Sequence, residues 1–294
     1  MLIILGYIVV IGSVLGGYTL VGGEMGALFQ PTELLIIGGA GAGAFLVGNC
    51  GKSINKTLKA IPLLFRGSKY TKKHYLDLMT LQFRLLSKAL QQGVLGLEKD
   101  LERPADSEIF KSYPALLGDE MIVNCTTDYL RLSNSGNMNA FEIESLMDGE
   151  IETYEYESDG PAKSLSAAGD GLPAFGIVAA VMGVVHALAS ADRPAAELGE
   201  LIARAMVGTF LGILLSYGFV SPLAAVLRQK YAENTKMMQC IKVTLLSSMH
   251  GYPPQIAVEF GRKVLYSSER PSFSELEEYV RDNKSVKTSA EQDA

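Results

Sequence analysis

The sequence predicts an all-α membrane protein, in which four transmembrane helices carry a helical cytoplasmic domain. Three observations lead to this fold class. Only 20% of the residues are charged while 48% are hydrophobic, and the mean hydropathy is +0.19, a balance that is more apolar than that of ordinary soluble domains. Apolar runs of membrane-spanning length occur in two closely spaced pairs. Amphipathic helical patterns fill the polar segments outside them.

The first pair of spans lies in residues 1–50. Residues 2–21 form an uncharged apolar run that is long enough to cross about 30 Å of hydrocarbon as a helix. The second run, 34–50, is shorter and rich in Gly and Ala. A short turn at 22–33, which holds Glu24 and Glu33, joins them. This part is expected to form two transmembrane helices in which neither span contains a carboxylate.

The second pair of spans lies in residues 172–227, with apolar runs at 172–191 and 205–227. Asp170 is predicted to be the N-cap of the third span, and Pro173 to lie in its first turn, where a missing N–H matters least. Pro222 lies within the fourth run. It is expected to free the carbonyl of Gly218 and to bend that helix.

The distribution of basic residues predicts the orientation in the membrane. The segment after the second span contains no acid and many bases, and Arg228, Lys230 and Lys236 follow the fourth span. Because cytoplasmic loops carry the excess of Lys and Arg, residues 51–171 are predicted to form a cytoplasmic helical loop and residues 228–294 a cytoplasmic C-terminal region with a frayed tail. The short turns are then periplasmic. A multi-pass protein of the bacterial inner membrane with both termini in the cytoplasm is expected.

Small residues recur at a spacing of four in all four spans: Gly12 and Gly16, Gly39 and Gly43, Gly176 and Ala180, and Gly208, Gly212 and Ser216. In lipid, helices associate mainly through close van der Waals contact, which small residues permit. The pattern therefore predicts tightly packed helices and an oligomeric assembly.

The spans lack the group that an ion carrier needs. No Asp, Glu or Lys occurs in 172–191 or in 205–227, although carriers of protons or cations in a bilayer normally use an ionisable side chain. An ion-accepting carboxylate would have to come from a partner helix. Thr209 is a candidate for the polar wall around it, unless its hydroxyl bonds its own preceding turn. Asp170 could add a charge at the cytoplasmic mouth.

The cytoplasmic part begins with an amphipathic pattern over residues 75–97. From Glu98 to Asp159, acids outnumber bases by 16 to 4, which indicates either a solvated face or a surface that meets a partner by charge. Asn139 and Glu142 have the spacing of a capping box.

No motif of an enzyme is visible. The three Cys and three His residues are scattered, and no phosphate-binding loop or catalytic triad occurs. Neither an enzymatic activity, a cofactor, a metal site nor a nucleic-acid partner is expected.

Four segments resemble the MotA family of flagellar stator subunits, part of the MotA/TolQ/ExbB proton channel family, and the resemblance covers nearly the whole chain. They are LGGYTLVGGEMGALFQPTELLIIGGAGAGAFLVGN, KAIPLLFRGSKYTK, GLPAFGIVAAVMGVVHALASADRPAAELG and MVGTFLGILLSYGFVSPLA. The resemblance implies a pentameric ring of this subunit in membrane lipid around two copies of MotB. MotB brings the ion-accepting Asp and a peptidoglycan-binding domain, and ion flow then drives torque on the rotor protein FliG.

The resemblance also implies roles for five residues of the ion path. Pro173 and Pro222 match the two functional prolines of the family, Asp170 its acid at the cytoplasmic mouth, and Thr209 the hydroxyl that faces the ion. Ala180 occupies a position where sodium-driven relatives carry Thr, so Ala suggests that protons are transported.

On the rotor side, Glu98 matches the rotor-facing acid of the family, and Glu150 belongs to the acidic segment that is expected to face the rotor. Leu90 stands where Arg is expected, and Lys88 or Arg84 on the same helix could supply the missing charge. Two alternatives stay open: a subunit of an ExbB/TolQ-like energy transducer, and a transporter or enzyme that works alone. Four spans with a long loop between the second and third favour the MotA family.

Overall fold

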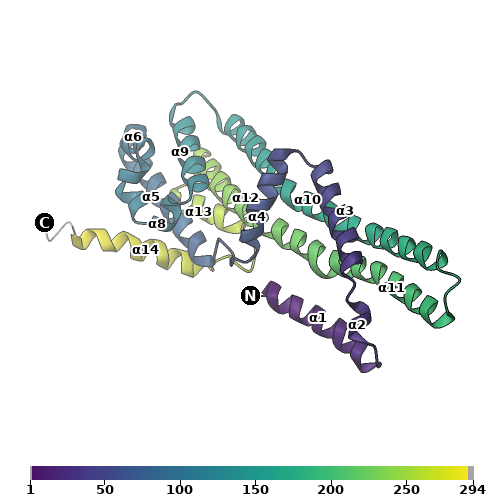
Figure 1. The fold of residues 1–294 in the computed structure, drawn as a ribbon. Coiled ribbons are helices and arrows are strands. Elements are labelled where there is room, and N and C mark those ends of the chain that lie inside the picture. The colour runs from purple at the N-terminus through teal and green to yellow at the C-terminus, as the bar shows by residue number, and fades with distance from the viewer. Residues whose placement is uncertain (1, 291–294) are drawn as a thin grey trace. The chain divides into compact units, whose positions relative to one another are not determined.

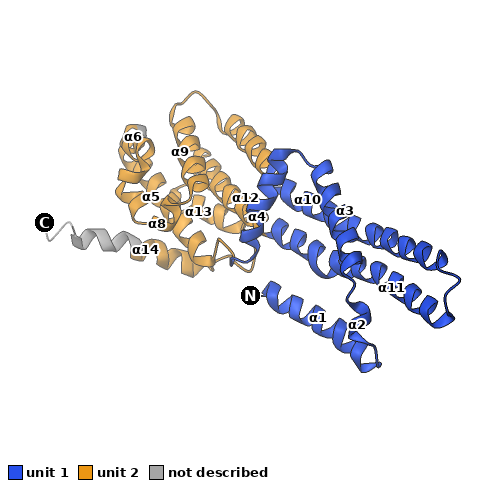
Figure 2. Ribbon diagram, viewed as in Figure 1, with its two compact units in different colours: residues 1–67, 157–229 blue, residues 68–156, 230–294 orange. Residues whose placement is uncertain are grey.

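A computed structural model describes residues 2–290 of the chain. Every regular element among these residues is a helix (Figure 1), which confirms the all-α class. The chain forms two compact units: unit 1 comprises residues 1–67 and 157–229, and unit 2 comprises residues 68–156 and 230–294 (Figure 2).

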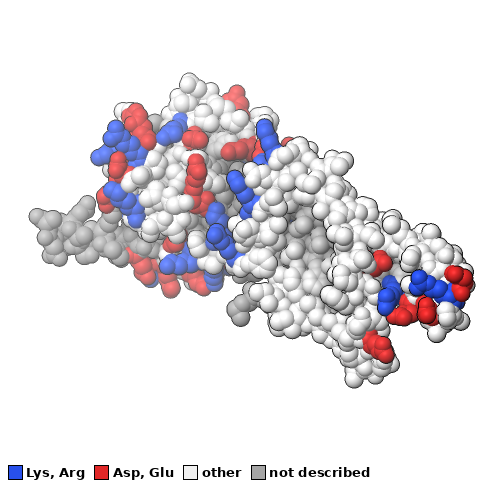
Figure 3. All heavy atoms as spheres, in the orientation of Figure 1, with Lys and Arg blue, Asp and Glu red and all other residues white. Residues whose placement is uncertain are grey.

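Unit 1 holds the apolar helices. It contains α1 (Leu2–Leu20), α2 (Met25–Leu28), α3 (Pro31–Gly48), α4 (Gly51–Leu64), the second part of α10 (Ala140–Leu188), α11 (Ala195–Ile213), the π-helix η3 (Leu214–Val220) and the start of α12 (Ser221–Met249). Four stretches are long and apolar enough to cross a membrane: Leu2–Leu20, Met25–Gly48 and parts of Ala140–Leu188 and Ala195–Met249. The prediction of four spans is confirmed. In Figure 3 the visible face of unit 1 is largely free of charged side chains until the end that carries the α10–α11 turn.

The helix of the third span begins far before the apolar run. α10 starts at Ala140 and continues through Pro161 and Pro173. The predictions that Asp170 caps this helix and that Pro173 lies in its first turn are therefore wrong. Hydropathy marks where a helix can meet lipid, whereas helical hydrogen bonding continues through the polar residues before it. Pro173 instead lacks an N–H in the helix interior, where the carbonyl of Gly169 loses its usual donor.

The fourth span is irregular directly before Pro222. Residues Leu214–Val220 form a π-helix, and the N–H of Ser221 donates to the carbonyl of Ser216. A π-turn accommodates an extra residue. Ser221, five residues after Ser216, therefore stays on the helix face that carries Gly208, Gly212 and Ser216.

Unit 2 is built around α5 (Lys72–Gln92), which the sequence predicted as an amphipathic helix over 75–97. Gly93, with a φ of +70°, follows its end. Around it lie η1 (Val94–Leu97), α6 (Glu98–Glu102), η2 (Pro104–Asp106), α7 (Glu108–Lys111), α8 (Pro114–Leu117), α9 (Glu120–Asn134), the start of α10, the end of α12, α13 (Pro254–Lys263) and α14 (Phe273–Ala290).

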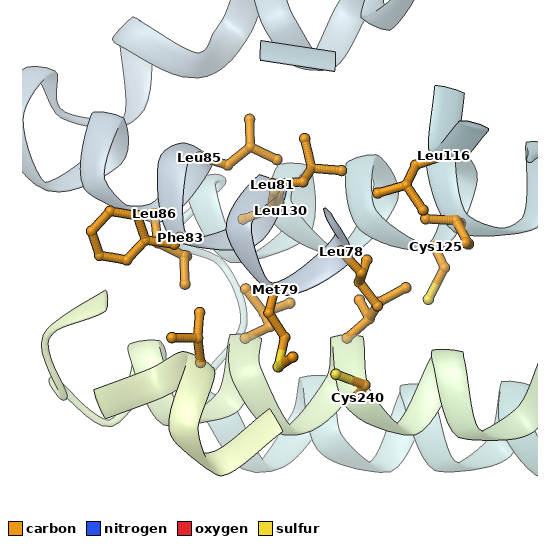
Figure 4. Packing of buried hydrophobic residues seen from close by; sticks show 14 of the residues in the cluster. Leu78, Met79, Leu81, Phe83, Leu85, Leu86, Leu116, Cys125, Leu130 and Cys240 are labelled. Carbon is orange, nitrogen blue, oxygen red and sulfur yellow. The ribbon is translucent and has the colours of Figure 1, made fainter. Parts of the chain in front are cut away.

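The core of unit 2 forms along the apolar face of α5. Leu78, Leu81, Leu85 and Leu86 are buried there with residues of α8, α9 and α12 (Figure 4). Leu90, near the end of the same helix, is 74% exposed. Burial of the four other Leu residues supplies roughly 2 kcal/mol of stabilisation for each side chain, so this face orients α5.

Two helix starts of unit 2 are capped by side chains. The N–H of Asn139 donates to Glu142 Oε2 at 2.8 Å, and the N–H of Glu142 donates to Asn139 Oδ1 at 3.0 Å, so the predicted capping box is confirmed. Ser272 and Glu275 form the same reciprocal pair at the start of α14. The expectation of a frayed tail does not hold for the start of α14, because its apolar Leu276 is buried in the core. Residues 291–294 lie outside the described residues.

Candidate ion-path and rotor-facing residues

Helices α10 and α11 approach so closely that only small residues fit between them. A methyl group at Gly176 would lie 2.7 Å from the carbonyl oxygen of Gly208, and one at Gly212 would lie 2.7 Å from that of Leu172. A methyl group at Gly183 would lie 2.5 Å from Ala205 Cβ. These contacts order the two helices as an antiparallel pair. The predicted close packing is therefore present in the second pair of spans.

The four glycines of the spacing pattern in the first pair of spans have no such contacts among the described residues. Methyl groups at Gly12, Gly16, Gly39 and Gly43 would meet no other atom within 4 Å. The same spacing thus has two structural outcomes in one chain. In the first pair the close approach is made instead by Gly41, where a methyl group would lie 2.8 Å from Leu172 Cδ2 of α10.

Thr209 and Ala180 lie at the same level of the α10–α11 pair. Gly208, which precedes Thr209 on α11, packs against Ala179 Cβ and the backbone N of Ala180 on α10: a methyl group at Gly208 would lie 3.1 Å and 3.2 Å from these atoms. Thr209 and Ala180 are both half-buried. The hydroxyl and the methyl group assigned to the ion path therefore lie on neighbouring turns of two packed helices.

Asp170 and Pro222 lie at a second level of the pair, and Pro173 follows Asp170 by about one helical turn. A methyl group at Gly169 would lie 2.9 Å from Ser221 Oγ and 3.2 Å from Val220, so Asp170 and Pro222 each adjoin a residue of this contact. The ten residues from Asp170 to Ala180 correspond to about 15 Å along a helix. The five predicted ion-path residues are therefore divided between two levels of the α10–α11 pair.

Glu33, which the sequence predicts to lie in a turn, belongs to a helix. It is the third residue of α3, follows Pro31 at the helix start, and is only 8% exposed. The expectation that the second span contains no carboxylate is therefore wrong. The signal was present in the sequence, because Pro is favoured at the first position of a helix and Pro31 thus indicates a start before Glu33.

An open pocket of about 290 Å³ lies in unit 1 between α3 and α10. Its polar lining is Asn49, Lys163 and Ser164. Ser164 Oγ donates to Asn49 Oδ1 at 2.6 Å, and Ser53 Oγ lies 3.1 Å from Ser164 Oγ. This hydrogen-bonded group links α3, α4 and α10 at the opposite end of α3 from Glu33.

Among the rotor-facing candidates of unit 2, Lys88 is half-buried and paired with a buried acid. Its Nζ lies 2.6 Å from Oδ2 of Asp100, which is 6% exposed. Ser107 Oγ donates to the other carboxylate oxygen of Asp100. The ammonium group of Lys88 therefore neutralises a buried carboxylate and is not presented to solvent as a free charge.

Arg84 is similarly engaged, with its guanidinium carbon 5.9 Å from the centroid of the Tyr113 ring. Glu98 and Glu150 are exposed. Glu150 accepts a hydrogen bond from the hydroxyl of Tyr129, and burial together with this bond raises the pKa of Tyr129 well above its usual value. Glu98, Glu150 and Leu90 thus remain available at the surface of unit 2, whereas Lys88 and Arg84 contact their own unit.

Known proteins resemble this chain over almost its full length. Residues 4–93 match the family described as Motility protein A N-terminal, and residues 120–240 match the MotA/TolQ/ExbB proton channel family. Motility protein A of Salmonella typhimurium is 70% identical over 96% of this chain and 95% of its own length. Motility protein A of Escherichia coli is 68% identical over the same shares.

Solved structures show the same fold. The structure of C. jejuni MotAB matches with a TM-score of 0.74 at 20% identity and covers 92% of this chain and 98% of that one. The flagellar MotAB stator complex from Bacillus subtilis matches with a TM-score of 0.69 at 26% identity, over 87% and 92%. The family matches to both parts of the chain and the 70% identity to Motility protein A of Salmonella typhimurium establish that this protein belongs to the motility protein A family, within the MotA/TolQ/ExbB proton channel family.

Proposed function

We propose that this chain is the A subunit of a flagellar stator, which forms a proton channel with MotB and converts proton flow into torque on the rotor. The observation that carries this proposal is the α10–α11 pair. Its helices are packed through Gly176, Gly208 and Gly212, and its apolar stretches contain no Asp or Glu. Such a pair can form the wall of a channel but needs the carboxylate of a partner helix.

In this function, the Asp of MotB alternately binds and releases a proton beside Thr209 and Ala180. Ala180 offers no hydroxyl oxygen to a sodium ion, which favours protons. Release occurs toward the level of Asp170, Pro173 and Pro222. Each proton supplies about 2.3 kcal/mol per 100 mV of membrane potential. This free energy drives stepwise rotation of the ring of subunits.

We place this chain in a pentamer around two MotB copies in the inner membrane, with both termini in the cytoplasm. The excess of Lys and Arg after the second and fourth spans supports this orientation. Unit 2 then faces the rotor protein FliG with its exposed acids Glu98 and Glu150. The four-helix membrane part leaves α1 and most of α3 in contact with lipid.

The basic test is complementation. The unmutated chain is expected to restore swimming to a strain that lacks its own motility protein A, only when MotB is also present. The match of residues 120–240 to the MotA/TolQ/ExbB family makes an ExbB/TolQ-like energy transducer the second candidate. A chain that restores outer-membrane energy coupling but not swimming would establish that function instead.

Thr209→Val is expected to lower proton flow. Valine has the size of threonine without its hydroxyl, so one hydrogen bond to the ion path is lost at a cost of about 1 kcal/mol, which corresponds to about a fivefold slower step. Proton uptake by vesicles that hold the complex with MotB measures the change. Thr209→Ser, which keeps the hydroxyl, is the matched control. Equal uptake by the Val and Ser variants would remove Thr209 from the path.

Leu90→Arg is expected to strengthen coupling to the rotor, because the family resemblance places a positive charge here and complementary charges orient partners. Since Leu90 is 74% exposed, stability should change by less than about 0.5 kcal/mol. Swimming speed in viscous medium measures coupling at high load. Leu95→Arg, at a residue that is 82% exposed, is the control, and an equal gain in both variants would show a nonspecific effect of charge.

A further inference from the structure

Glu33 is a carboxylate enclosed by the membrane helices. A methyl group at Gly208 of α11 would lie 2.7 Å from Glu33 Oε2, and one at Gly183 of α10 would lie 3.8 Å from Glu33 Oε1. The side chain is 8% exposed. Glu33 therefore reaches from α3 to the place where α10 and α11 pack against each other.

One oxygen of this carboxylate lacks a partner. Glu33 Oε2 is buried and makes no hydrogen bond within the described part of the chain. An ionised carboxylate without a partner is costly to keep away from water, so a group of this kind requires a proton, a cation or a bound water. In membrane helices, ionisable residues in such positions usually belong to ion pathways.

The charged and titratable groups on the surrounding helices do not neutralise Glu33. On α11, Arg204 forms its ion pair with Glu200. On α10, His186 is exposed. Glu24, which precedes α2, is exposed as well, and α1 and the remainder of α3 carry no charged residue.

Two further polar atoms without partners lie in the continuation of α11, in η3 and at the start of α12. Ser216 Oγ and Ser221 Oγ are buried and make no hydrogen bond within the described residues. With Gly208 and Gly212 they share one face of α11, η3 and α12, because the π-helix keeps Ser221 in register with Ser216. This face runs from Glu33 toward the level of Asp170, and its polar atoms could bind water at several points.

We propose that Glu33 is a proton-binding site on the periplasmic side of the ion path, which takes up protons and passes them on toward the level of Thr209. This inference rests on the proposed function and on the predicted orientation. Gly208 connects the two sites, since it contacts Glu33 and directly precedes Thr209. Glu33 supplements the Asp of the partner helix and does not replace it.

A purely structural role for Glu33 predicts different behaviour. As an acid in the first turn of α3, Glu33 also stabilises this helix by its favourable interaction with the helix dipole. Its side chain in addition fills space between the helices. Glutamine fills nearly the same space but cannot bind and release a proton. The dependence of proton flow on periplasmic pH therefore distinguishes a proton-binding role from a packing role.

The experiment measures proton uptake, normalised to the amount of assembled complex, by vesicles that hold the full chain with MotB. Wild type, Glu33→Gln, Glu33→Asp and the control Glu24→Gln are compared at acidic, neutral and alkaline pH on the periplasmic side. Glu33→Gln should lower uptake about tenfold at alkaline pH, where a local carboxylate raises the supply of scarce protons most, and little at acidic pH. Glu33→Asp should retain most of the uptake, and Glu24→Gln should match wild type.

Two results would overturn the proposal. Uptake by Glu33→Gln that equals wild type at every pH would show that no proton passes through Glu33. A reduction of equal size at every pH, shared by Glu33→Asp, would assign Glu33 to packing. Absence of uptake by the unmutated complex would instead refute the proposed function, so the two failures can be told apart.

Discussion

Replacing Gly212 with alanine is expected to destabilise the chain by about 1–3 kcal/mol and to abolish swimming, although alanine is ordinarily the better helix former. A methyl group at Gly212 would lie 2.7 Å from the carbonyl oxygen of Leu172 and 2.9 Å from Gly176 Cα. These are backbone atoms, which cannot rotate away as a flexible side chain can. α10 and α11 would have to separate, and their association in lipid depends on close approach.

Gly199→Ala is the matched control for this prediction. Gly199 lies on the same helix, α11, and a methyl group there would meet no atom within 4 Å. This variant should gain up to about 1 kcal/mol of stability, because alanine loses less backbone entropy on folding than glycine. Thermal unfolding of the purified subunit in detergent, followed by circular dichroism, measures both variants. Equal stability of the two would contradict the close packing of α10 and α11.

The second large effect is expected at Lys88. Lys88→Glu should destabilise the chain by about 3 kcal/mol or more, because it removes the cation from the buried Asp100 and places a like charge beside it. In the structure, Lys88 Nζ lies 2.6 Å from Asp100 Oδ2. Ser107 alone would then be left to stabilise the carboxylate. Unfolding of the full chain in detergent and the amount of protein in the membrane measure the loss.

Two further variants show whether the loss arises from the ion pair. Lys99→Glu changes the same charge at an exposed residue and should alter stability by less than about 0.5 kcal/mol. Lys88→Met combined with Asp100→Asn removes both charges and should recover most of the stability. Normal stability of Lys88→Glu together with weak torque would contradict the buried pair and would instead support a direct contact of Lys88 with the rotor.

Much of the fold could be predicted because a bilayer restricts composition along the chain. A membrane helix needs about 20 mostly apolar residues, so the four spans were visible as four runs, and the buried face of α5 was visible as Leu residues at helical spacing. Helix boundaries were less visible. Asp170 looked like a cap because an apolar run follows it, yet α10 had begun at Ala140.

The candidate site could be predicted only in part. The resemblance pointed to Thr209 and Ala180, and the structure places them on neighbouring turns of packed helices. The resemblance could not show that Lys88 is paired with Asp100. The chain turns back between α5 and Asp100, so the two residues have no spacing in the sequence that would indicate their contact. Nor did the position of Glu33 near a turn indicate its burial, because burial depends on which helices pack around it.

By itself, therefore, the sequence determined that four helices are apolar enough to span a membrane and that the second pair carries no carboxylate. These properties are local, and each follows from the residues of one segment. Only the tertiary structure decided which small residues make contacts, since Gly39 and Gly212 both belong to patterns of small residues at a spacing of four but differ in their surroundings in space. It also decided that Glu33 lies between helices and that Lys88 faces inward. The physical reason is that close packing and charge pairing are made between segments, and their strength depends on distances that the sequence does not contain.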